Sequence, residues 1–251
     1  MDMRTRSGRH AIQVSNLSKR FDDTTVVDDI SFEVEHGCTY ALLGANGAGK
    51  TTTLAMLLGL LVPTAGEIYV LGVDMLRDRY RALPRINYAS PYVDLPQRLT
   101  VRQNLKIYGR LYGVPQLKRR IEELAAELDL EPFIDRAYRS MSSGQKTRVA
   151  LAKALLNRPE VLLMDEPTAS LDPDTADRIR AYLRDYQHAT GATLLLASHN
   201  MLEVERLCDQ VLMMRAGRIV NRGTPQELVA HYGRHSMEEV FLDVARHEAL
   251  T

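Results

Sequence analysis

One eight-residue stretch constrains this chain more than any other. It reads Gly44-Ala45-Asn46-Gly47-Ala48-Gly49-Lys50-Thr51. It matches the pattern G-x-x-x-x-G-K-[ST] at every fixed position. The apolar run 39–43 before it has the length of a buried strand, and residues 51–58 after it begin a helix that Gly59 can close. A strand, a glycine-rich loop and a helix in this order predict a phosphate-binding loop.

Each fixed residue type in the loop has a physical role. The glycines let the backbone curl so that several N–H groups point inward, and the helix N-terminus adds positive potential. Lys50 can reach the β- and γ-phosphates of a nucleoside triphosphate, and the Thr51 hydroxyl can become a ligand of Mg²⁺. Thr52 follows in the same helical turn. These roles favour a nucleotide site over a glycine-rich turn before an ordinary helix.

The composition argues against several classes of partner. Lys+Arg and Asp+Glu both number 32, so no global field favours nucleic acid. No apolar run reaches the ~18–20 residues of a membrane span, and there is no secretory signal, which predicts a protein that stays in the cytosol. Basic residues gather near the N-terminus, but residues 1–11 are expected to be a frayed tail rather than a binding arm.

The order of the predicted elements indicates an α/β fold. Alternating apolar and polar residues at 12–17 and 30–34, with an edge-like strand at 24–27, predict an antiparallel β region before the phosphate loop. Helical spacing dominates residues 95–157, where the last helix, from Gly144 to Asn157, is apolar on more than one face. We therefore expect a phosphate-loop NTPase core with a mixed sheet, an antiparallel β subdomain and an inserted α-helical subdomain.

The remaining elements alternate between strand and helix. Further strands are predicted at 67–71, 86–89, 161–164 and 193–197, helices at 173–189 and 201–207, and a hairpin from 211–214 and 219–221. Apolar residues from Met237 to Ala245 recur at the spacing of one amphipathic helix, packed on its own domain.

Two acids follow the apolar run 161–164. Carboxylates at the C-terminal end of a parallel strand lie in the crevice where α/β sheets bind ligands. Asp165 is thus placed to hold Mg²⁺ through water, and Glu166 can orient or deprotonate an attacking water. Pro167 removes an N–H and ends the strand. Behind a phosphate loop, the pair is predicted to be catalytic.

A second glycine-containing segment, Ser142-Ser143-Gly144-Gln145, begins the last helix of the helical stretch. Its exposed N–H groups suit a phosphate, but the same residues also suit a serine N-cap, and the local sequence does not decide. Spacing favours the phosphate, because Ser142 precedes Asp165 by 23 residues and His199 follows Asp165 by 34.

Taken in order, from about Ile12 to Gly223, these motifs resemble the nucleotide-binding subunit of an ABC transporter. The phosphate loop is similar to the family's Walker A motif, and residues 161–166 to Walker B with its catalytic glutamate. Residues 141–145 resemble the signature, usually L-S-G-G-Q, with Met141 and Ser143 as departures. Residues 169–172 resemble the D-loop, and Ser198-His199 resembles the switch histidine.

The resemblance implies an ATPase that couples ATP hydrolysis to transport, with ATP and Mg²⁺ bound. Lys50, Glu166 and His199 would be catalytic, Thr51 and Asp165 would hold the metal, and Phe21 would contact adenine. Two chains would face each other head to tail, as a homodimer, so that one chain completes the other's site. The completing residues would be Ser142, Gly144, Gln145 and Asp172.

The resemblance further implies a separate integral membrane subunit and a peripheral position on the cytoplasmic face of the plasma (inner) membrane. Residues 12–223 would be the ATPase domain and 224–251 a short helical extension similar to those of drug, polysaccharide or nodulation-factor exporters. The exposed loop 92–98 and the helical region beyond it would contact the membrane subunit. The alternatives are a soluble ABC ATPase acting on ribosomes or DNA, and a nucleotide-binding module without turnover.

The chain departs from the family at one further position. Pro91 stands where the family usually carries a glutamine, and the nearest glutamine, Gln97, lies six residues later. Either Gln97 bends back to the metal, or the protein works without that ligand and Gln97 is an exposed contact. Pro91 and Pro96 each fix one φ angle of the loop, which restricts its bending and favours the second alternative.

Overall fold

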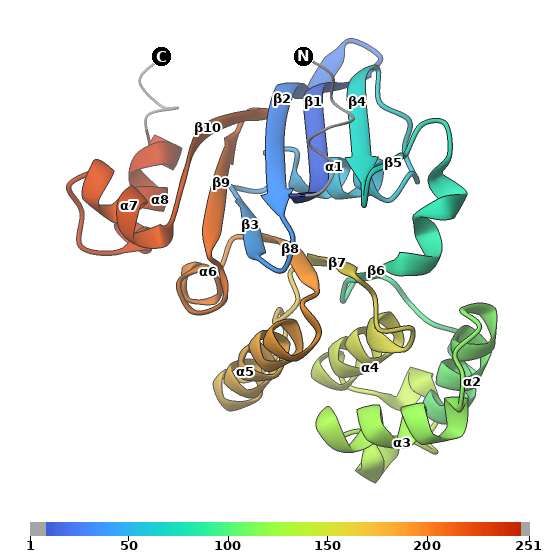
Figure 1. Cartoon of the computed structure of the whole chain (residues 1–251). Coiled ribbons are helices and arrows are strands. Elements are labelled where there is room, and N and C mark those ends of the chain that lie inside the picture. The colour runs from blue at the N-terminus through green and yellow to red at the C-terminus, as the bar shows by residue number, and fades with distance from the viewer. Residues whose placement is uncertain (1–8, 247–251) are drawn as a thin grey trace.

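Two β-sheets organise the computed structural model, which describes residues 9–246 (Figure 1). The first sheet is antiparallel, with the strand order β2-β1-β4-β5. Its strands are β1 His10–Phe21, β2 Thr24–Glu35, β4 Ala65–Val70 and β5 Val73–Asp74. The predicted antiparallel β region is confirmed, and strands from beyond the phosphate loop complete it.

Two predictions near the N-terminus are wrong in detail. Residues 24–27 are not a separate edge strand but the first part of β2. Asp29 has a φ of 51°, which is a local irregularity in the strand. Asn16 Nδ2 donates to the Asp29 side chain at 3.0 Å, so β2 continues past this point without a turn. Since β1 begins at His10, the last residues of the expected tail belong to the sheet. Residues 1–8 of that tail lie outside the described residues.

The second sheet is mixed, as predicted, with the strand order β10-β9-β3-β8-β7-β6. Its strands are β3 Thr39–Leu43, β6 Ile86–Ala89, β7 Val161–Asp165, β8 Thr193–Ser198, β9 Gln210–Arg215 and β10 Arg218–Gly223. All neighbouring pairs are parallel except β9–β10, which form the predicted hairpin. The carboxyl ends of β3, β8 and β7 therefore meet at one edge of the sheet.

Helices fill the spaces around the second sheet. They are α1 Lys50–Leu57, α2 Val101–Leu111, α3 Leu117–Glu127, α4 Ser143–Leu155, α5 Pro173–Thr190, α6 Met201–Leu207, α7 Pro225–His231 and α8 Met237–Arg246. Short 3-10 turns lie at Arg79–Arg81, Leu83–Arg85, Glu131–Phe133 and Tyr138–Ser140. No helix within the described residues is long and apolar enough to cross a membrane.

The second sheet separates two hydrophobic cores. In β3, Ala41 and Leu43 face the core shared with α2–α8, whereas Tyr40 and Leu42 face the core shared with α1 and the antiparallel sheet. Every residue of β3 is buried, and each fully buried Leu is worth about 1.5–3 kcal/mol. The strand that presents the phosphate loop is therefore fixed on both faces. The predicted burial of α4 on more than one face is also confirmed.

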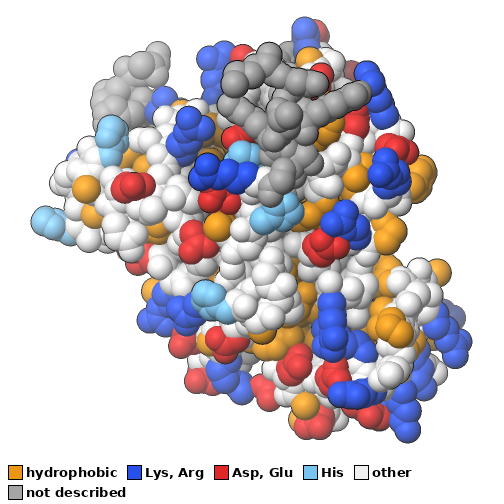
Figure 2. All heavy atoms as spheres, viewed as in Figure 1, with side chains coloured by type: hydrophobic (Ala, Val, Ile, Leu, Met, Phe, Trp, Pro, Cys, Tyr) orange, Lys and Arg blue, Asp and Glu red, His pale blue; other side chains and the backbone are white. Residues whose placement is uncertain are grey.

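Charges on the surface are mixed. Positive and negative side chains are interspersed over the face shown in Figure 2, in line with the equal numbers of basic and acidic residues. On that face, charge alone gives no reason to expect a polyanionic partner.

Candidate nucleotide site

The phosphate loop joins the end of β3 to the start of α1. Gly47 and Gly49 have φ values of 84° and 100°, which side chains other than glycine rarely adopt. A Cβ atom at Gly49 would lie 2.7 Å from the Val26 carbonyl oxygen, so the loop also packs too tightly there for a side chain. The glycines at these positions are therefore required by the shape of the loop.

Lys50 is buried beneath the loop that it follows. Its Nζ donates to the carbonyl oxygens of Gly44 at 2.6 Å and Ala45 at 3.1 Å. Burial lowers the pKa of Lys50, and the charges of Glu166 and Asp165 oppose that shift. The ammonium group thus lies inside the curl of the loop, where a phosphate would sit, and close to both acids.

Thr51 and Asp165 meet across the site. The Thr51 hydroxyl donates to Asp165 Oδ2 at 2.8 Å. Asp165 ends β7 and is 5% exposed, because β8 and β6 flank the strand on both sides. A hydroxyl and a carboxylate are oxygen ligands of the kind that Mg²⁺ prefers, so this pair fits a magnesium site.

Glu166 and His199 form the second contact between strand ends. His199 Nδ1 lies 2.6 Å from Glu166 Oε1. Glu166 is in the left-handed region, with a φ of 52°, and its N–H donates to the carbonyl of Ala197 in β8 at 2.9 Å. His199 follows β8 directly, and its side chain is 56% exposed. A buried carboxylate held at one oxygen by an imidazole keeps the other oxygen for a water molecule.

These groups line one cavity of about 500 Å³. The cavity is formed by Val26, Asn46, Gly47, Ala48, Gly49, Lys50, Thr51, Thr52, Tyr88, Ser90, Tyr92, Val93, Asp165, Glu166 and His199. The structure thus brings together most of the predicted loop residues, both acids and the histidine. Gly44 and Ala45 contribute their carbonyl groups to Lys50 instead.

Sequence reasoning missed five of the lining residues, of which Val26 comes from β2. Tyr88 and Ser90 lie at and just after the end of β6, and Tyr92 and Val93 follow in the next loop. Because β6 pairs with β7 in parallel, its carboxyl end reaches the same edge of the sheet as Asp165. A strand was predicted at 86–89, and the position of its carboxyl end next to the acids could have identified the residues around that end as part of the site.

The predicted signature residues do not line this cavity. Ser142 caps α4, since its Oγ accepts from Gln145 N at 3.2 Å and Gln145 Oε1 accepts from Ser142 N at 3.0 Å. Gly144 packs against the turn after β7, where a Cβ atom would lie 3.2 Å from the Ser170 carbonyl oxygen. Within one chain, Ser142 and Gln145 therefore act as a capping box.

Phe21 and Asp172 also lie outside the cavity lining. Phe21 ends β1 and is 45% exposed, with Lys19 Nζ 4.9 Å from the centre of its ring. Asp172 caps α5 by accepting from Thr175 N at 3.0 Å, and this bond is the main reason that its pKa is lowered. The nucleotide contacts predicted for both residues stay predictions.

Gln97 is placed away from the cavity as well. Its carbonyl oxygen accepts from Arg139 N at 2.9 Å, which ties this part of the loop to the helical region. The side chain is half-buried, so the expectation of an exposed Gln97 is wrong. Ser90, the neighbour of Pro91, is buried and lines the cavity instead.

Comparison with known proteins connects this geometry to one family. The family described as ABC transporter matches residues 27–169. A curated relative, the Nod factor export ATP-binding protein I of Ralstonia nicotianae, is 40% identical over 92% of this chain and 73% of its own length. The protein of the same name from Rhizobium sp. is 39% identical over 92% of this chain and 76% of its own length.

Solved structures resemble the whole fold. One described as the ATP binding subunit of an ABC transporter superposes with a TM-score of 0.86 at 28% identity, covering 94% of this chain and 99% of that chain. The cbiO1 protein of Clostridium perfringens, described as part of the ABC transporter complex cbiONQ, gives a TM-score of 0.78 at 30% identity and covers 89% and 92% of the two chains.

Proposed function

The chain belongs to the ABC transporter family and is an ATP-binding ATPase of that family, and we propose that it powers a separate membrane-spanning exporter. The observation that carries this proposal is the convergence of Lys50, Thr51, Asp165 and the Glu166–His199 pair on one cavity. Relatives at about 40% identity are named as export proteins, which supports the direction of transport.

In the proposed site, the loop from Gly44 to Thr52 holds the phosphates of ATP. Lys50 exchanges its bonds to the loop carbonyls for bonds to the β- and γ-phosphates, which are stronger because both partners are charged. Thr51 and Asp165 would hold Mg²⁺, which supplies charge neutralisation on the phosphates when it is bound. Phe21 offers an exposed aromatic face for adenine.

Hydrolysis is assigned to Glu166 and His199. The free carboxylate oxygen of Glu166 orients a water molecule and accepts its proton. His199, bonded to the other oxygen, fixes the carboxylate and can contact the γ-phosphate from its exposed side. Lys50 compensates the negative charge that the transition state spreads over the phosphate oxygens.

A second copy of the chain is proposed to complete the site. Within one chain, the cavity lining does not include Ser142, Gly144, Gln145 or Asp172. In a head-to-tail homodimer, the N-terminus of α4 from one chain would face the γ-phosphate on the other, with its N–H groups and the positive end of its dipole. ATP would then join the two chains, and hydrolysis would release them.

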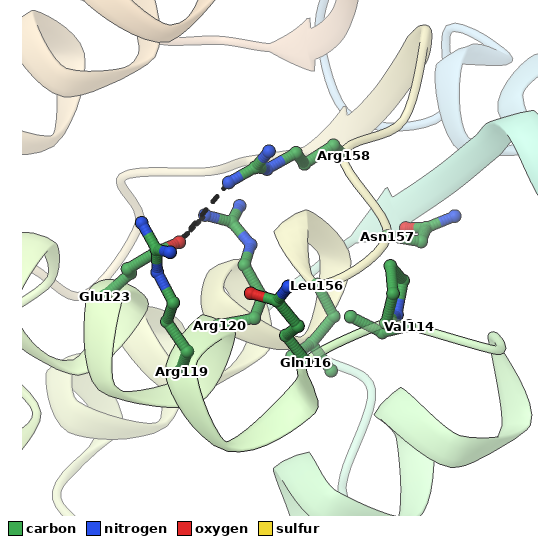
Figure 3. Close-up of a pocket in the computed structure, with 9 residues that line it drawn as sticks. Val114, Gln116, Arg119, Arg120, Glu123, Leu156, Asn157 and Arg158 are labelled. Carbon is green, nitrogen blue, oxygen red and sulfur yellow. Dashed lines mark hydrogen bonds and ion pairs between the residues drawn. The ribbon is translucent and has the colours of Figure 1, made fainter.

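The membrane subunit is proposed to dock on the helical region. A pocket of about 420 Å³ lies between the start of α3 and the end of α4. Figure 3 shows Arg119, Arg120 and Arg158 gathered around Glu123, whose carboxylate they contact at 2.9, 3.4 and 3.3 Å. Three cations around one carboxylate leave an excess of positive charge, which suits an acidic segment.

Exposed apolar side chains lie on the same helical region. Ile107 and Leu111 are 43% and 73% exposed and, four residues apart, share one face of α2. An acidic cytoplasmic segment with apolar neighbours would match this surface, and docking there would hold the chain at the cytoplasmic face of the membrane.

Coexpression with a candidate multi-span membrane subunit tests the proposal. The chain should then co-purify with the membranes, and Arg119→Glu combined with Arg158→Glu should release it while the isolated chain still hydrolyses ATP. Arg77→Glu, an exposed arginine beside the antiparallel sheet, is the control and should stay bound. Equal binding by all variants would contradict docking at this pocket.

A further inference from the structure

Glu203 is a buried carboxyl group behind the hydrolytic pair, and the mechanism above gives it no role. It lies in the first turn of α6 and is 1% exposed. Burial raises the pKa of Glu203, and the nearby charge of Glu166 acts in the same direction. A carboxyl group at such a position is unfavourable unless its hydrogen bonds compensate for the lost water.

The bonds of Glu203 join the two segments that carry Glu166 and His199. Thr168 Oγ1 donates to Glu203 Oε1 at 2.7 Å, and both residues are buried. The Ser198 side chain is a second hydrogen-bond partner of the same carboxyl group. Thr168 lies two residues after Glu166, and Ser198 immediately precedes His199.

The turn that carries Glu166 depends on such anchors. A φ of 52° is a sparsely populated conformation for a glutamate, and the surroundings must hold it. Glu166 N–H donates to the carbonyl of Ala197, and Ala169 N–H donates to the carbonyl of Glu166 at 3.0 Å. The turn is thus fixed at Glu166 by β8 and, two residues later at Thr168, by Glu203.

We propose that Glu203 is a positioning residue for hydrolysis, which sets the relative placement of Glu166 and His199 through Thr168 and Ser198. The inference rests on the proposed roles of Glu166 and His199. The described residues that line the cavity do not include Glu203, Thr168 or Ser198. Loss of Glu203 should therefore slow turnover without weakening the hold of the phosphate loop on ATP.

The steady-state ATPase kinetics of three variants test this assignment. Glu203→Ala should lower kcat by roughly 10- to 100-fold, because small misplacements of reacting groups have effects of this size. Its KM for ATP should stay within about threefold of wild type. Glu203→Gln keeps an oxygen for Thr168 and should restore kcat to within about threefold. Thr168→Val, which removes only the hydroxyl donor, should reproduce part of the loss.

The control is Glu205→Gln, an exposed glutamate on the same helix, which should leave kcat unchanged. Wild-type kcat in both Glu203→Ala and Thr168→Val would overturn the inference. So would equal losses in kcat and ATP affinity that Glu203→Gln does not restore, since a merely structural defect behaves in this way. Glu166→Gln, measured in parallel, distinguishes a failure of this inference from a failure of the proposed function. Normal turnover in Glu166→Gln would overturn the role of Glu166 itself, and with it the role of Glu203.

Discussion

The hydroxyl of Thr51 donates to the carboxylate of Asp165 at 2.8 Å, although the two residues are 114 positions apart in the chain. The bond joins the first turn of α1 to the end of β7, and it places two oxygen ligands side by side at the edge of the central sheet. The proposed metal dependence of the enzyme follows from this contact.

Removal of the metal should abolish ATP hydrolysis, and Asp165→Asn should make the enzyme less sensitive to Mg²⁺. The amide keeps the shape but loses the charge, so the Mg²⁺ concentration for half-maximal activity should rise by roughly 10- to 100-fold. Titration of ATPase activity with Mg²⁺ after treatment with a chelator measures this. Unchanged Mg²⁺ dependence in Asp165→Asn would rule out a metal role for this carboxylate.

Lys50→Ala should weaken ATP binding and abolish turnover. A charge-assisted hydrogen bond contributes about 1.5–3 kcal/mol, so the Kd for ATP should rise by roughly 10- to 100-fold. Fluorescent-nucleotide titration gives the Kd, and Lys118→Ala, on the exposed start of α3, serves as the control. ATP binding of wild-type strength in Lys50→Ala would show that the lysine stays on the loop carbonyls.

Ser142→Ala tests whether the start of α4 acts on a second chain. Combined with Glu166→Gln, it should make ATP-induced dimers rarer in size-exclusion chromatography. The substitution also removes a helix cap worth about 1 kcal/mol, so the control must be a variant that loses a similar cap elsewhere. Thr224→Ala removes the same kind of capping box from α7 and should leave the dimer yield unchanged. Dimer yields that do not differ between the two variants would mean that Ser142 is only a helix cap.

Gln97→Ala should leave the ATPase rate of the isolated chain within a few-fold of wild type, because Gln97 does not line the cavity. Its effect should appear only in the assembled transporter, since the loop around it leads into the helical region. A tenfold loss in the isolated chain would place Gln97 in the nucleotide site after all.

Much of the site could be predicted from the sequence because its parts are local. The phosphate loop, the acids after an apolar strand and His199 are each defined by residues adjacent in the chain. Their meeting follows from parallel strands whose carboxyl ends share one edge. The Glu166–His199 contact is an example, since the two residues directly follow the neighbouring strands β7 and β8.

Other features depend on contacts that local sequence does not encode. Separate strands were predicted at 24–27 and 30–34, but β2 is continuous across residues 28–29, where Asn16 on the paired strand donates a hydrogen bond to Asp29. Glu203 has no motif of its own, and only the packing of α6 behind the site brings its carboxyl group to Thr168. Thr224 and Glu227, by contrast, form the capping box of α7, a local signal that sequence reading could have used.

In the proposed mechanism, Glu166 activates the water that attacks ATP. The most direct measurement compares ATP hydrolysis and ATP binding by Glu166→Gln with those of the wild type in the same Mg²⁺ buffer. We expect hydrolysis to fall by roughly 10²- to 10⁴-fold while Mg-ATP still binds and holds the chain as a dimer. Near-normal turnover in Glu166→Gln would contradict this mechanism.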